Sequence, residues 1–108
     1  MQLTPRHISI LERLCAREFQ IVAFPMYADY VGVRKGNCAA LLAPVASGEF
    51  SVCVKPAYLI QGNFSVRMKH DADEWFVWKT VRIEATPERI GELDRFSEEL
   101  TESLLPIA

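Results

Sequence analysis

The residues best suited to chemistry gather between positions 67 and 82, where cationic, aromatic and acidic side chains alternate. Within this stretch, His70, Asp71, Asp73 and Glu74 are the types that bind a divalent cation or form a histidine–carboxylate acid/base pair. The same types are also typical of a polar hairpin tip. Because no second group of ligands from a distant segment accompanies them, the cluster predicts a turn and not a metal site.

Motifs for catalysis or cofactor binding are absent from the sequence. It contains no GxSxG, GxxxxGK[ST], GxGxxG or HExxH motif and no EF-hand loop. Cys15, Cys38 and Cys53 are widely spaced and form no CxxC pair, which predicts small buried hydrophobic side chains and not a disulfide framework or a zinc site. His7 is expected to be a surface or capping residue. We therefore expect no catalytic residues, no metal and no cofactor.

Residues 74–85 (EWFVWKTVRIEA) are predicted to form one strand that is apolar on both faces for half its length. Side chains alternate along a strand, so the odd positions share one face. Apart from Lys79 this face is apolar: Trp75, Val77, Val81, Ile83 and Ala85. The even positions begin with Phe76 and Trp78 and then turn polar. The odd face is therefore expected to be the core face.

A hairpin centred on residues 70–73 sets the register of this strand against residues 64–69. It pairs Lys69 with Glu74 and Arg67 with Phe76, and it adds Phe64, Val66 and Met68 to the core face. The opposite face then carries both cationic and aromatic side chains. Its members are the candidate ligand- or partner-binding residues: Arg67, Lys69, Phe76, Trp78 and Arg82.

Four interpretations of that face remain open. Trp, Phe and Arg are enriched at protein interfaces, and a two-fold homodimer is the simplest such interface. The cations above an aromatic ring could also hold an anionic small molecule or lipid headgroup, or single-stranded nucleic acid. The net charge of −2 and the absence of an RNP signature argue against nucleic acid. Alternatively, the chain's own residues 27–30 or 57–60 cover the two aromatic rings.

Helical patterns at both ends enclose a central region of period-two alternation. Thr4-Pro5 and Thr86-Pro87 each place an N-cap residue before proline, which predicts helices over residues 4–18 and 87–105. Between them the alternation predicts strands separated by breaks rich in Gly, Asn and Pro. The expected strands span residues 19–24, 30–34, 38–43, 50–55, 64–69 and 74–85. The short gaps between them favour antiparallel neighbours.

The expected fold is a single α+β domain over residues 1–108. In it an antiparallel twisted sheet of five to six strands is bracketed by an N-terminal helix and a longer C-terminal helix, both packed on one face. The N-terminal segment does not resemble a signal peptide, and no apolar run approaches the roughly 20 residues of a membrane span. A cytoplasmic location is therefore expected.

Charge is distributed unevenly along the chain. Residues 1–69 carry a net charge of +4 and residues 70–108 a net charge of −6. Such asymmetry can orient self-association, although a solvated acidic helix face would give the same pattern. We expect a non-enzymatic binding or adaptor domain that acts through a homodimer or protein interface around Phe76 and Trp78. The alternative is an anionic-ligand binding protein or small enzyme with a pocket between sheet and helices, in which Lys79 would be the nucleophile or base.

Overall fold

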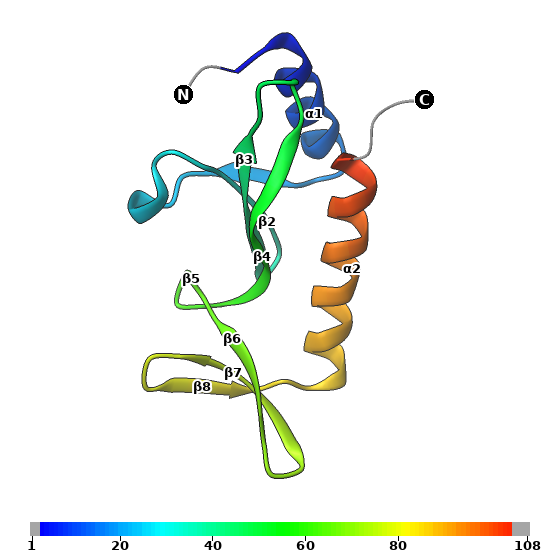
Figure 1. Cartoon of the computed structure of the whole chain (residues 1–108). Helices are drawn as coiled ribbons and strands as arrows, with labels where there is room; N and C mark the ends of the chain where they lie inside the picture. Colours follow the sequence, from blue (N-terminus) through cyan, green and yellow to red (C-terminus); the bar gives the residue numbers. More distant parts are fainter. Residues whose placement is uncertain (1–2, 105–108) are drawn as a thin grey trace.

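The computed structural model describes residues 3–104, and this part of the chain forms two helices and two antiparallel sheets (Figure 1). The helices are α1 (Pro5–Ala16) and α2 (Pro87–Leu104). The larger sheet has the order β1 (Gln20–Val22), β2 (Val31–Lys35), β3 (Cys38–Pro44), β4 (Phe50–Ile60) and β5 (Asn63–Phe64). The smaller sheet has the order β6 (Val66–His70), β7 (Asp73–Trp78) and β8 (Val81–Glu84). The predicted α+β antiparallel fold is confirmed, with its strands divided between two sheets.

Both helices cover one face of the larger sheet and share a single core with it. Helix α1 contributes Ile10 and Leu14, and α2 contributes Leu93, Phe96 and Leu100. These side chains meet buried residues of the strands: Val31, Val33, Cys38, Ala40, Leu42, Phe50, Tyr58 and Ile60. Burying side chains of this size contributes roughly 1.5–3 kcal/mol each relative to leaving them in water. This contiguous core fixes both helices against the sheet.

The opposite face of the larger sheet is covered by the connection between β1 and β2, which includes a short 3₁₀ turn, η1 (Pro25–Tyr27). The ring of Phe24 lies 4.8 Å from that of Phe64, measured between centroids. Gly32 lies under Phe24, and a Cβ atom at position 32 would come within 2.6 Å of that ring. Only glycine therefore allows this close approach.

Strand β4 continues beyond its predicted end at residue 55. Pro56 was expected to break the strand, because proline cannot donate a hydrogen bond to a ladder. The pairing of β3 with β4 instead has an irregularity between Ala39 and Leu41, and Pro56 falls within it. Proline is tolerated at such bulges. The longer strand brings Tyr58 beneath the smaller sheet.

Hydrogen bonds at both ends of α1 define where the helix begins and ends. At its start the Thr4 hydroxyl accepts from the backbone N–H of His7, completing a capping box. At its end the N–H of Phe19 donates to the carbonyl of Leu14 at 3.1 Å, and the N–H of Glu18 to that of Cys15 at 3.0 Å. These two bonds form a Schellman motif, in which Glu18 takes the left-handed position with φ 71°.

Replacing Glu18 with glycine is expected to raise the free energy of unfolding by about 1 kcal/mol, because an L side chain in the left-handed region costs that amount relative to glycine. Urea titration measures the change. Glu18→Ala is the control: it removes the same charge but keeps a Cβ atom, so no comparable gain is expected. An equal gain from alanine would assign the effect to the lost carboxylate and not to backbone conformation.

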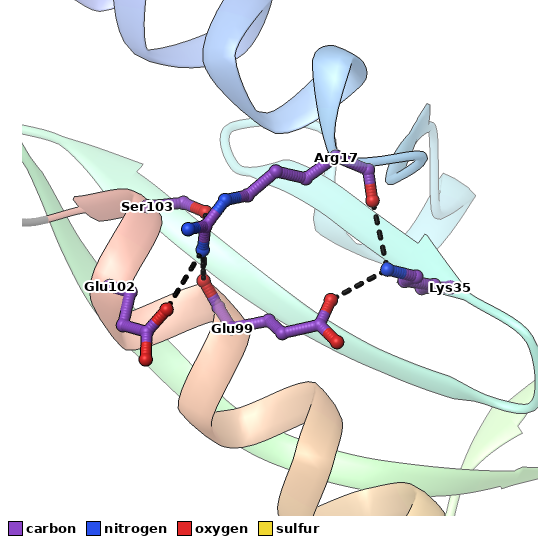
Figure 2. Close-up of polar contacts among 5 residues, drawn as sticks. All are labelled: Arg17, Lys35, Glu99, Glu102 and Ser103. Carbon is purple, nitrogen blue, oxygen red and sulfur yellow. Dashed lines mark hydrogen bonds and ion pairs between the residues drawn. The ribbon is translucent and has the colours of Figure 1, made fainter.

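A polar cluster holds the C-terminal half of α2 against the rest of the fold (Figure 2). Lys35 on β2 donates to the Glu99 carboxylate at 2.6 Å and to the Arg17 carbonyl at 2.9 Å. The Arg17 guanidinium contacts the Glu99 carbonyl, the Glu102 carboxylate and the Ser103 hydroxyl, each at 3.2 Å. The cluster thus joins α1, β2 and α2, which are distant in sequence.

Burial of the cysteines differs from the sequence prediction. Cys38 is buried as expected, and burial together with the nearby Glu92 carboxylate raises the pKa of its thiol to about 12. Cys15 and Cys53 are exposed, so that part of the prediction was wrong. Cys15 lies in the last turn of α1 on the side away from the core, which its apolar neighbours in sequence did not reveal. Neither described helix is long and apolar enough to cross a bilayer.

The predicted second helix ends at residue 105, which lies outside the described residues.

Candidate functional site

The smaller sheet lies at the end of the molecule opposite α1 (Figure 1). Its register confirms the predicted hairpin: Lys69 pairs with Glu74 and Arg67 with Phe76. The turn is tighter than four residues, because His70 also pairs with Asp73. Directly paired residues point to the same side of a sheet, so the strand pairing defines both faces.

We call one of these faces the outer face. Its members are the cross-strand rows Val66–Val77–Arg82, Met68–Trp75–Glu84 and His70–Asp73. Val66 and Met68 keep 63% and 52% of their surface exposed. The Arg82 guanidinium lies 4.6 Å from the centroid of the Trp75 ring, a cation–π arrangement. Exposed aliphatic side chains therefore lie beside an aromatic ring and a cation.

The other face, here the inner face, is directed toward the core. Phe76 is only 1% exposed and stacks on Tyr58 of β4, with centroids 4.9 Å apart and an interplanar angle of 11°. Three further side chains of this face are partly buried and pack against the same core: Trp78, Val81 and Ile83. Phe76 and Trp78 therefore do not form an open aromatic surface.

For β6 and β7 the two faces are the reverse of those expected from the sequence, whereas Val81, Ile83 and Ala85 pack in the core as expected. Residues 74–85 were expected to form one strand, but Lys79 and Thr80 form a turn that pairs Trp78 with Val81. A two-residue turn places even positions of β7 opposite odd positions of β8. Ile83 therefore pairs with Phe76 on the inner face, and Arg82 pairs with Val77 on the outer face. The alternative that residues 57–60 cover the aromatic pair holds for Phe76, through Tyr58.

The structure separates the five candidate residues. Arg67, Lys69, Phe76 and Trp78 belong to the inner face, and Arg82 alone belongs to the outer face. The side chains of Arg67 and Lys69 nevertheless reach solvent at the edge of the sheet. Lys69 and Arg82 line a cavity of about 230 Å³ on the outer side, together with Met68, His70, Trp75 and Val77. Three apolar side chains and the basic side chains of His70 and Arg82 therefore meet there, whereas the Lys69 side chain belongs to the inner face.

Glu74 neutralises part of the positive charge of β6. Its carboxylate forms an ion pair with the Arg67 guanidinium, and that hydrogen bond lowers the pKa of Glu74. Lys69 lowers the pKa of Glu74 further by its charge. The same ion pair raises the pKa of Arg67. The Glu74 carboxylate therefore interacts with two cations on this side of the sheet.

The other residues considered for chemistry show no constellation for catalysis. Lys79 is exposed at the β7–β8 turn, with its ammonium 4.9 Å from the centroid of the Trp78 ring, so it is not a buried base. His70 contacts Asp71 at 3.6 Å on an exposed hairpin tip. Within residues 3–104, no group of three or more His, Cys, Asp or Glu side chains is arranged to hold a metal ion. His7 belongs to the capping box of α1, one of the two predicted roles, but its ring is buried and does not lie on the surface.

Sequence reasoning missed four outer-face residues by assigning them to the core: Val66, Met68, Trp75 and Val77. The signal that would have found them is the turn at Lys79 and Thr80. This dipeptide lacks the Gly, Asn, Asp and Pro that mark hairpin turns, and Lys79 adopts a left-handed φ of 54°.

No protein-family model, curated protein or solved structure matches this chain.

Proposed function

We propose that this chain is a non-enzymatic binding domain that recognises a protein through the outer face of its smaller sheet, most simply a second copy of itself. The supporting observation is the exposure of Val66 and Met68 beside Trp75. Exposed apolar groups that adjoin an aromatic ring and an arginine are typical of protein interfaces. Burying this group against a partner removes apolar area from water, which favours association.

Two charges of the outer face, Arg82 and Asp73, can pair with each other in a two-fold contact. Arg82 lies toward the β7–β8 turn, whereas Asp73 lies toward the hairpin tip. A two-fold axis along the Met68–Trp75 row reverses the strand direction in the second copy. It would therefore bring Arg82 of each copy near Asp73 of the other, with Met68 and Trp75 between them, and it would set Glu84 opposite Glu84 of the second copy at the β8 edge. Opposite charges at a rim favour the correct orientation of two copies.

Light scattering coupled to size-exclusion chromatography tests this proposal. The wild type is expected to elute with twice the 12.3 kDa mass of one chain, and the Val66→Ser/Met68→Ser variant as a monomer. The matched control is Val52→Ser/Met26→Ser, which removes two aliphatic side chains that are 44% and 87% exposed elsewhere. A monomeric wild type, or a control that dissociates equally, would rule out self-association through the outer face.

A second candidate function is the binding of an anionic small molecule. The basic and apolar lining of the 230 Å³ cavity suits a carboxylate attached to an apolar ring. Benzoate is a suitable probe, with tryptophan fluorescence as the readout because Trp75 lines the cavity. A saturable change that is lost in Arg82→Ala would favour this function, whereas no change on titration would exclude benzoate-like ligands.

A further inference from the structure

We draw no further inference here: the strongest candidate, the outer edge of β4 before Leu59, which pairs with no other strand among residues 3–104, carries nothing because irregularities at Cys53 and Pro56 interrupt it and nothing in the structure shows what covers it.

Discussion

Replacing Phe76 with alanine is expected to lower the free energy of unfolding by about 3–5 kcal/mol. The ring is buried between β7 and the core and stacks on Tyr58, so its removal loses apolar contacts and leaves a cavity. Because a domain of this size is stabilised by only about 5–15 kcal/mol, a large fraction of its stability depends on this one side chain. Urea titration followed by circular dichroism measures the change.

Trp75→Ala is the matched control, because Trp75 is the adjacent aromatic residue on the opposite face. It is only partly buried, and we expect a smaller loss of about 1–2 kcal/mol. If Phe76→Ala does not fold, Phe76→Leu provides a measurable substitute with a loss of about 1–2 kcal/mol. A larger effect at Trp75 than at Phe76 would restore the face assignment that the sequence alone suggested, and would contradict the structure.

This pair of substitutions addresses the step at which sequence reasoning reversed the two faces of β7. Alternation correctly showed that residues 74–78 are apolar on both faces, but it could not show which face is buried. That depended on the turn at Lys79 and Thr80, two residues without a typical turn signal. Because this turn was missed, the outer side chains of β6 and β7 were assigned to the core face, although Val81 and Ile83 of β8 were assigned to it correctly. A missed turn therefore changes the face assigned to every side chain of a strand, and not only that of the residues in the turn.

Local signals were more reliable where their chemistry is specific. The Thr4 and Thr86 caps, the register set by Lys69 and Glu74, and the antiparallel pairing all agree with the structure. The cluster of Arg17, Lys35 and Glu99 was not predicted. It joins three segments through contacts that no short-range spacing encodes. The same holds for the stacking of Tyr58 on Phe76, which depends on β4 continuing through Pro56.

The second large effect is expected at His7, which connects the start of α1 to the loop between β3 and β4. Its Nδ1 atom accepts from the backbone N–H of Thr4 at 3.0 Å, and its Nε2 atom bonds to the carbonyl of Glu49 at 2.9 Å. Because a carbonyl can only accept, Nε2 carries the proton of a neutral ring. The ring is 2% exposed and lies 4.9 Å from Phe50, between centroids.

His7→Ala is therefore expected to lower the free energy of unfolding by about 2–4 kcal/mol, because it removes a buried ring and leaves the Thr4 N–H without its partner. The Glu49 carbonyl loses one of its two donors and keeps the backbone N–H of Val45 at 2.9 Å. His7→Gln is the discriminating control. A glutamine at this position can restore the bond to Thr4, but it does not replace the ring, so we expect it to recover only about 1 kcal/mol. Wild-type stability of His7→Gln in urea titration would show that the capping box accounts for the whole effect. Equal losses in both variants would instead assign the effect to the contacts with Glu49 and Phe50, which tie the helix to the sheet.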